Sequence, residues 1–199
     1  MKVINNITCL KSVLLTILLC TQANLSANEI PEYLAENQLE EVVMPDVDVK
    51  ELSVKSIQIE IIKLTDNSGL TYLGGKVNAA DLDIYLLQMK KILGDDFLLY
   101  RRYQSERDHQ TFHMTLVNPY EYQALTKDTD ISGTFSVSLR GLGRVSQDNK
   151  ATYFVVAQSP EAASYRQTLT LAKKDFHVTL GFYPNDIYGV NKGVGSIIE

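Results

Sequence analysis

Two nearly identical five-residue stretches decide the fold of this chain: Phe-His-Met-Thr-Leu at residues 112–116 and Phe-His-Val-Thr-Leu at residues 176–180. The chain contains 3 histidines, and two of them lie in these stretches. Once one histidine is given, chance would repeat phenylalanine, threonine and leucine at the same offsets about once in a few thousand comparisons. The repeat therefore indicates a chain built from two similar halves, each with its own copy of this segment.

Strand geometry gives the repeated segment its meaning. Successive side chains of a β-strand point to opposite faces, so His113 and Thr115 share one face while their apolar neighbours share the other. The same alternation holds for His177 and Thr179. Each strand is expected to bury its apolar face and to offer an imidazole and a hydroxyl on the opposite face. If the halves pack about an approximate twofold axis, both pairs line one cleft.

Such a cleft suits phosphodiester cleavage by two histidines. An unperturbed imidazole titrates at about 6.5, so one ring can take a proton from water or a ribose hydroxyl while the other protonates the leaving oxygen. The threonine hydroxyls can donate to the non-bridging phosphate oxygens. This chemistry needs no metal and no other cofactor. A two-histidine metal site, disfavoured because acids and cysteines are lacking at ligand spacing, and core histidines with ordinary polar partners are the alternatives.

The pattern of the whole chain indicates the α+β class. Isoleucines alternate with polar residues over 57–61, as in a half-buried strand, and apolar residues recur at helical spacing over 79–93. A second helix is expected from a cap at Ser159 to about Lys174. Two antiparallel sheets would form a central cleft with the helices on the outside. Further strands are expected at residues 97–106, 111–117, 135–140, 152–157 and 176–183.

The two His-x-Thr pairs, with Asn118-Pro119 after the first and Gly-Phe-Tyr-Pro-Asn-Asp at 181–186 after the second, resemble the two-histidine (2H) phosphoesterase superfamily. Within it, the chain is similar over residues 55–195 to the branch called Swiss-army-knife RNA-repair-like proteins. The resemblance implies a bilobal fold and hydrolysis of 2′,3′-cyclic phosphates or 2′-5′ phosphodiesters. It also implies that the first histidine is the acid and the second the base for cyclic-phosphate opening. The positions that match the family's catalytic residues are His113, Thr115, His177 and Thr179.

Residues 1–27 have the character of a secretory signal. Lysines are their only charged residues, and an apolar run shorter than the roughly 20 residues of a membrane span precedes small residues. Cleavage is expected after Ala23 or Ala27; a lipoprotein signal ending at Cys20 and a retained anchor are the alternatives. Cleavage would remove both cysteines, Cys9 and Cys20, and leave an exported protein, periplasmic or secreted, without stable membrane insertion.

Composition and charge limit the partners. With 45% hydrophobic residues and a mean hydropathy of -0.09, the chain is neither wholly disordered nor a polytopic membrane protein. Residues 28–53 form an acidic lead-in, so residues 54–199 are expected to form the folded domain of two pseudo-symmetric lobes, as a monomer. The formal net charge of -5 becomes -7 without the two lysines of residues 1–27, which excludes nonspecific duplex-DNA binding. The expected partner is a small nucleotide or an RNA end.

Three further residues are candidates for substrate binding. Tyr183 has the strand parity of the second His-x-Thr pair, so its ring could stack on a base. Lys192 is a candidate phosphate contact, and Arg107 could reach a phosphate if the strand over 97–106 continues. A rim tyrosine and ordinary solvated charges are the alternatives at these positions.

The sequence favours one function over two others. Because both His-x-Thr pairs are intact, a metal-independent phosphodiesterase is the preferred hypothesis. The alternatives are a nucleotide-binding module that keeps the cleft without turnover, and a purely structural exported domain.

Overall fold

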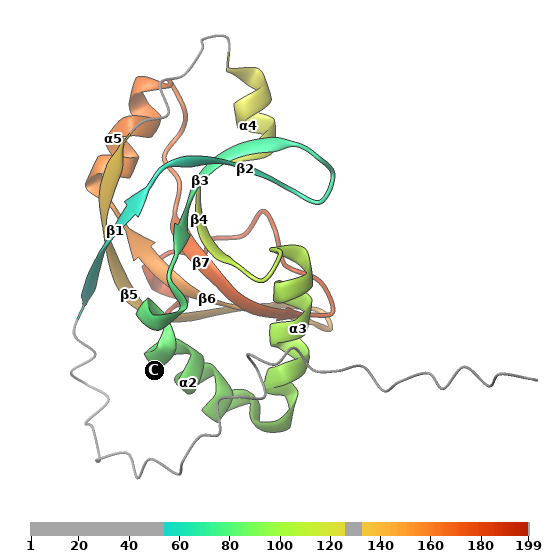
Figure 1. Ribbon diagram of the computed structural model, residues 1–199. Helices are drawn as coiled ribbons and strands as arrows, with labels where there is room; N and C mark the ends of the chain where they lie inside the picture. Colours follow the sequence, from blue (N-terminus) through green and yellow to red (C-terminus); the bar gives the residue numbers. More distant parts are fainter. Residues whose placement is uncertain (1–53, 126–132, 199) are drawn as a thin grey trace, which may run out of the picture. The chain divides into compact units, whose positions relative to one another are not determined.

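The computed structural model describes residues 54–125 and 133–198, and its strands form one sheet (Figure 1). The predicted signal over 1–27 and the lead-in over 28–53 lie outside the described residues. Within the described residues, seven antiparallel strands are arranged in the order β1-β5-β6-β7-β4-β3-β2. Their bounds are β1 Lys55–Glu60, β2 Ile62–Thr65, β3 Thr71–Val77, β4 Phe112–Val117, β5 Thr134–Gln147, β6 Lys150–Gln158 and β7 Phe176–Tyr183.

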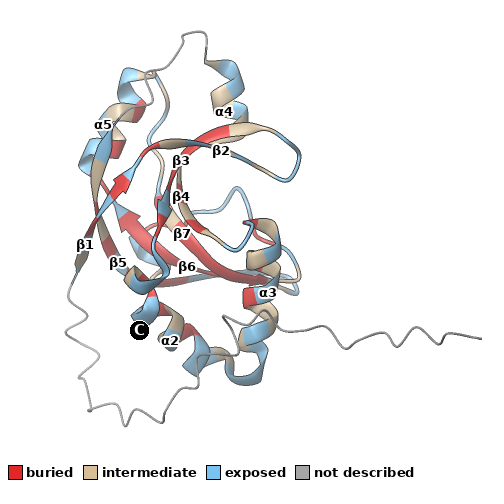
Figure 2. Ribbon diagram, viewed as in Figure 1, coloured by how far each residue is buried: buried red, intermediate tan, exposed pale blue. Residues whose placement is uncertain are grey.

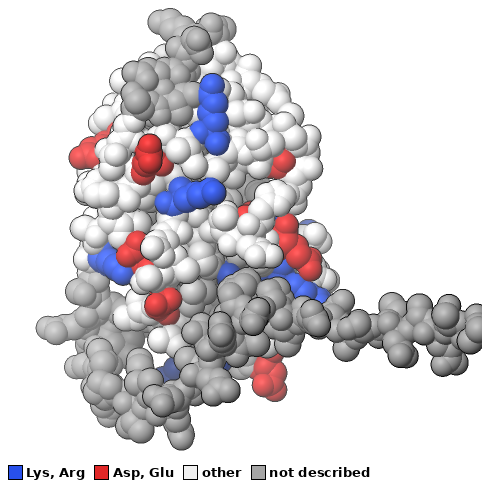
Figure 3. All heavy atoms as spheres, in the orientation of Figure 1, with Lys and Arg blue, Asp and Glu red and all other residues white. Residues whose placement is uncertain are grey.

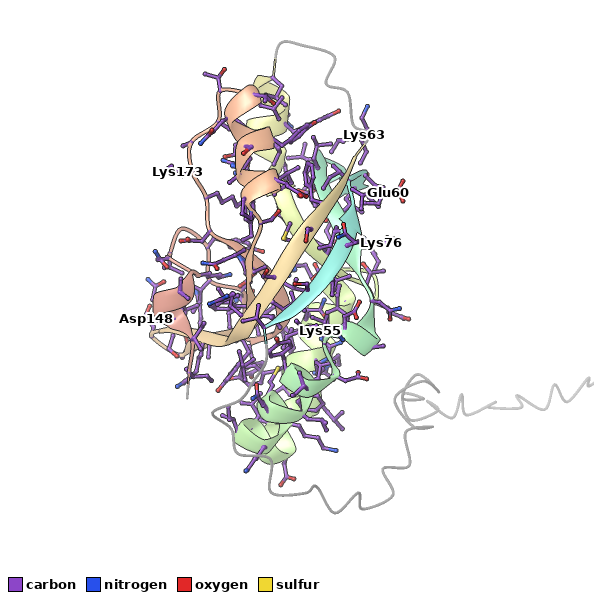
Figure 4. The ribbon with its side chains drawn as sticks, turned by 90° about the vertical axis from the view of Figure 1, so that its left-hand side faces the viewer. Lys55, Glu60, Lys63, Lys76, Asp148 and Lys173 are labelled. Carbon is purple, nitrogen blue, oxygen red and sulfur yellow. The ribbon has the colours of Figure 1, made fainter. Side chains whose placement is uncertain are left out.

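Short helices connect these strands. Figure 4 shows β1 beside β5, with α5 at one end of the strands and α2 at the other. Antiparallel strands with separate helices place the described residues in the α+β class, as the sequence predicts. No helix among the described residues is long and apolar enough to cross a membrane. The α-helices are α2 Asp83–Leu93, α3 Phe97–Arg107, α4 Pro119–Ala124 and α5 Pro160–Thr168, and the 3-10 helices are η2 Ala79–Asp81, η3 Gly94–Asp96 and η4 Val194–Ser196.

Two halves repeat the order strand, strand, helical segment, strand. The N-terminal half, residues 62–117, contains β2, β3, α2, α3 and β4, and the C-terminal half, residues 134–183, contains β5, β6, α5 and β7. The last strands of the halves pair with each other through Met114 and Val178. The expectation of two sheets is therefore wrong in this respect. The strands that carry the His-x-Thr pairs join both halves into one sheet.

The sheet curls so that one run of chain supplies both of its edge strands. β1 pairs with β5 at one edge, and β2, which follows after Ile61, pairs with β3 at the other. β1 also passes close to β3: a Cβ added at Gly75 would collide with the side chain of Ile59 and lie 2.8 Å from the carbonyl oxygen of Glu60. Glycine is therefore required where these strands cross.

The core lies on the sheet face opposite the His-x-Thr side chains. Phe112, Met114 and Leu116 are buried, as the alternation predicts, and Figure 2 shows β6 and β7 buried along most of their length. The helix predicted over 79–93 is confirmed, with its first turn formed by η2 and its continuation by α2. α2 contributes Tyr85 and Met89 to the core.

The strand predicted over 97–106 is wrong, because this segment forms α3. Its buried residues Arg101 and Gln104, and Asp108 just beyond its end, recur at helical spacing. They are polar, so a search for apolar periodicity overlooks them. The tyrosines and leucines of the segment fit a strand equally well by composition. Arg107 therefore lies at the end of a helix and not on an extension of a strand.

The second predicted helix begins as expected and ends early. The Ser159 side chain accepts a hydrogen bond from the amide of Ala162 at 3.1 Å, which caps α5. The helix ends at Thr168, short of Lys174, and Thr170 adopts a left-handed φ of 59°. The strand predicted over 176–183 is confirmed by β7 with the same bounds.

Candidate active site

The four residues of the His-x-Thr pairs line one cavity with a volume of about 1100 Å³. His113 and Thr115 enter it from β4, and His177 and Thr179 enter it from β7. The cavity therefore brings together side chains from both halves, as the twofold arrangement of the sequence predicts.

The pairing of β4 with β7 sets the relative positions of these side chains. Met114 lies opposite Val178, and the same antiparallel register carried one residue further places His113 opposite Thr179 and Thr115 opposite His177. Directly opposite Cβ atoms in such a pair are about 4.5–5.5 Å apart, and diagonal ones are about 7–8 Å apart. His113 and His177 therefore lie on a diagonal of this register.

Both motif strands contain a β-bulge at the leucine that follows the threonine. On β4, Thr115 pairs with Gly74 and Val117 with Leu73, so Leu116 has no partner on β3. On β7, Thr179 pairs with Phe154 and Gly181 with Tyr153, so Leu180 has no partner on β6. The two bulges occupy equivalent positions of the repeat.

The bulge on β7 explains why the structure does not place Tyr183 in the cavity. One extra residue reverses the alternation of side chains beyond it. Tyr183 therefore points toward α3, where its ring centroid lies 5.9 Å from that of Tyr100 and 5.2 Å from that of Tyr103. The expectation that Tyr183 shares the face of His177 is wrong for this reason.

His113 lies in the more open part of the site. Its ring centroid is 5.6 Å from that of Tyr72, and Lys76 of β3 is its cross-strand neighbour. Burial lowers the pKa of His113; Asp108 opposes this change and Arg107 adds to it. Burial also raises the pKa of Tyr72 to about 12, so its hydroxyl remains a hydrogen-bond donor in the cavity.

His177 lies in a more enclosed environment. The ring of Phe154 packs edge-on against the imidazole, with 5.5 Å between the ring centroids. The Nδ1 atom of His177 is buried without a hydrogen-bond partner among the described residues. Burial lowers the pKa of His177 to about 3, and Lys192 lowers it further while Asp186 opposes the change. The imidazole is therefore neutral near neutral pH.

A buried carboxylate joins the two candidate cations. Lys192 donates to Oδ1 of Asp186 at 3.0 Å, and Arg107 donates to its Oδ2. The hydroxyl of Thr152 donates to the same carboxylate at 2.9 Å. Burial alone would raise the pKa of Asp186, but the two cations and the hydrogen bonds lower it overall. Arg107 also forms a two-point ion pair with Asp108.

Lys192 and Arg107 thus line the cavity as expected, but as members of an ion-pair cluster and not as isolated phosphate ligands. Asp186 is a site residue that the sequence pattern does not predict, although it ends the 181–186 segment that follows the second pair. Tyr120 and Tyr188 are two more: they line the cavity and are 76% and 73% exposed. Among the described residues, no cluster of three His, Cys, Asp or Glu side chains could hold a metal ion.

Comparison with known families agrees with this geometry. The family model described as "Swiss Army Knife, 2H phosphoesterase domain" matches residues 72–188, which is more than half of the chain and includes both motif strands. The chain belongs to this family of 2H phosphoesterases. No curated protein and no solved structure gives a significant match.

Proposed function

We propose that this protein is a metal-independent phosphodiesterase that acts on 2′,3′-cyclic phosphates or 2′-5′-linked nucleotides. The observation that carries the proposal is the placement of both His-x-Thr pairs in one cavity, on two strands that pair with each other. Membership of a phosphoesterase family supports hydrolysis of a phosphodiester.

The two imidazoles divide the proton transfers between them. For a cyclic phosphate, His177 takes a proton from water, whose oxygen forms a bond to phosphorus. The bond between phosphorus and one ribose oxygen breaks, and His113 gives its proton to that oxygen. The products are a phosphate monoester and a free ribose hydroxyl. Proton exchange with solvent restores both rings.

The different environments of the two histidines support this division of roles. A general base must be neutral, and the pKa of His177 is lowered to about 3. His113 is the more open ring, and a bound phosphodiester anion raises the pKa of an imidazole that faces it. Thr115 and Thr179, each opposite a histidine of the other strand, donate to the non-bridging oxygens.

The cavity suits a nucleotide or a short RNA end. Its volume of about 1100 Å³ is close to the upper end of the range for ligand pockets. The exposed rings of Tyr120 and Tyr188 are available for stacking on bases, in place of Tyr183. On the face seen in Figure 3, basic and acidic side chains are interspersed, and neither sign forms a broad patch. This distribution supports a small substrate and not duplex DNA.

The proposal extends to the setting of the enzyme. The signal-like residues 1–27 support export to the periplasm or the exterior, and the acidic charge of the chain supports a soluble monomer. Radiolabelled or mass-resolved N-terminal analysis of the protein from its cell fraction tests cleavage after Ala23 or Ala27. Retention of the whole segment in the membrane fraction would contradict this part of the proposal.

The activity is tested on purified protein with 2′,3′-cyclic nucleotides and 2′-5′-linked dinucleotides in the presence of EDTA. Cleavage is expected, and His113→Ala and His177→Ala are each expected to slow it by about 10²-fold or more. Arg102→Ala, which changes an exposed residue of α3 outside the cavity, is the control. Full turnover by both site variants would overturn the proposal. Nucleotide-dependent thermal stabilisation without any product would instead identify a binding module.

A further inference from the structure

Each of the two β-bulges leaves one leucine outside the pairing with a neighbouring strand. A bulged residue loses its place in the hydrogen-bond ladder, so its carbonyl oxygen needs another donor when it is buried. Leu116 and Leu180 are both fully buried, and each follows directly after the threonine of a His-x-Thr pair. The position of each catalytic pair therefore depends on what holds the bulge beside it.

A buried arginine supplies the donor in both cases. Arg166 donates from Nη1 to the carbonyl oxygen of Leu116 at 2.7 Å, and Arg101 donates from Nη1 to the carbonyl oxygen of Leu180. The two arginines are 2% and 8% exposed. Neither lines the cavity that contains the histidines.

Each arginine crosses from one half of the molecule to the other. Arg101 belongs to α3 of the N-terminal half and contacts β7, and Arg166 belongs to α5 of the C-terminal half and contacts β4. Figure 1 shows α3 and α5 on opposite sides of the paired strands. The contacts thus follow the same approximate twofold relation as the catalytic pairs.

Other contacts fix the direction of both guanidinium groups. Arg166 forms a two-point ion pair with Glu121 at 2.9 and 2.7 Å and donates to the carbonyl oxygen of Ala172. Arg101 donates to Oε1 of Gln104 at 2.6 Å and lies over the ring of Phe112 at 4.5 Å. A planar group held at several points determines the position of the carbonyl oxygen that it binds.

A close helix approach makes the Arg101 contact possible. A Cβ added at Gly181, next to Leu180, would lie 3.1 Å from the main chain of Tyr100 and would collide with Met89. The absence of a side chain at Gly181 therefore lets α3 lie directly on β7. Arg101, the next residue after Tyr100, reaches the bulge from there.

We propose that Arg101 and Arg166 are a matched pair of positioning residues, each of which fixes the position of the histidine and threonine of the opposite half. Arg101 fixes the positions of His177 and Thr179, and Arg166 fixes the positions of His113 and Thr115. This inference rests on the proposed function for its catalytic consequence. Its structural consequence, the placement of the imidazoles, stands apart from turnover and can be measured separately.

The test compares Arg101→Met and Arg166→Met with the wild type by NMR titration of the histidines, which number 3 in the chain. Arg101→Met is expected to shift the pKa of His177 toward its ordinary value and to leave His113 unchanged, because a loosened strand admits water to one ring. Arg166→Met is expected to do the reverse. The corresponding kcat is expected to fall about 10²-fold, as for a misplacement of about 1 Å, with a smaller change in KM.

Two controls separate positioning from stability. Arg102→Met changes an exposed neighbour on α3 and is expected to alter neither imidazole. Glu121→Gln removes the charge of the ion pair but keeps a side-chain oxygen that accepts from Arg166, and it leaves the bond from Arg166 to Leu116 in place. It is therefore expected to lower the melting temperature without shifting the pKa of His113. Arg101→Lys and Arg166→Lys serve if the methionine variants do not fold, and they are expected to give smaller shifts in the same histidines.

Two results would overturn the inference. In the first, the arginine variants melt at lower temperature but keep both histidine pKa values and kcat. In the second, either variant shifts both rings equally. A wild-type protein that cleaves none of the nucleotides contradicts the proposed function alone, because the titrations still report whether each arginine sets its own histidine.

Discussion

The two halves of the molecule carry the same five-residue motif in different surroundings. His113 lies beside Tyr72 and Lys76 in the open part of the cavity, whereas His177 lies against Phe154, close to Lys192 and Asp186. After β4 the chain turns into α4 through the capping box of Asn118, and after β7 it continues into the segment that carries Asp186 and Lys192. The repeated strands give the two halves their symmetry, and the segments that follow these strands give the two histidines different surroundings.

The largest expected effect comes from removing both histidines. His113→Ala and His177→Ala are each expected to lower kcat by about 10²–10⁴-fold, which is the usual contribution of acid–base catalysis. Groups that act in one step are strongly non-additive, so the double variant is expected to lose little more than the worse single variant. Single-turnover rates measure this. Losses that multiply would show that the two rings act in independent steps.

The pH profile tests the electrostatic difference between the halves. The value of kcat/KM should fall as pH decreases through the pKa of His177, because the base becomes protonated, and as pH rises through that of His113, because the acid loses its proton. Both pKa values are lowered, so the maximum should lie below about pH 6.5. A maximum in the alkaline range would show that the pKa values of the two histidines are not lowered.

Lys192→Met tests the difference between the two histidines on the acidic limb of the pH profile alone. Lys192 lowers the pKa of His177, so its removal should move the acidic limb to higher pH. The alkaline limb, set by His113, should stay in place. Lys63→Met, which removes an exposed lysine at another part of the cavity, is the matched comparison. An acidic limb that does not move would show that burial alone sets the state of His177.

Stability should also depend on pH through His177. The unfolded chain has an ordinary histidine pKa of about 6.5, and the folded value is about 3, so between them only the unfolded chain binds this proton. The free energy of unfolding should therefore fall as pH decreases through this window, by at most about 1.4 kcal/mol per pH unit from this residue. His177→Asn should flatten the slope measured by urea unfolding, more than His113→Asn does. Equal slopes in His177→Asn and the wild type would contradict the burial of a neutral ring.

The smallest effect is expected at Tyr183. Because the bulge turns its ring toward α3, Tyr183→Phe should leave KM unchanged and should alter the free energy of unfolding by no more than about 0.5 kcal/mol. Tyr72→Phe removes a hydroxyl donor from the cavity and should raise KM. A raised KM in Tyr183→Phe alone would contradict the parity reversal on β7.

The sequence predicted what depends on local alternation and missed what depends on distant strands. The faces of 112–116 and 176–180 follow from strand geometry alone, and both are confirmed. The bulges at Leu116 and Leu180 depend on the partners of each strand, so no local pattern indicates them. The helix α3 has a polar buried face, so apolar periodicity does not indicate it. Asp186 becomes a site residue only through the cations that fold back onto it.

The run from Lys55 to Thr65 forms the outermost strand of each half, first as β1 and then as β2. A cut or a deletion within these residues would remove an edge strand from both halves at once. The amide protons of the two strands should therefore exchange with solvent as one cooperative unit. The same run therefore forms the two borders of the sheet, which are the places where another polypeptide could add a strand and start aggregation.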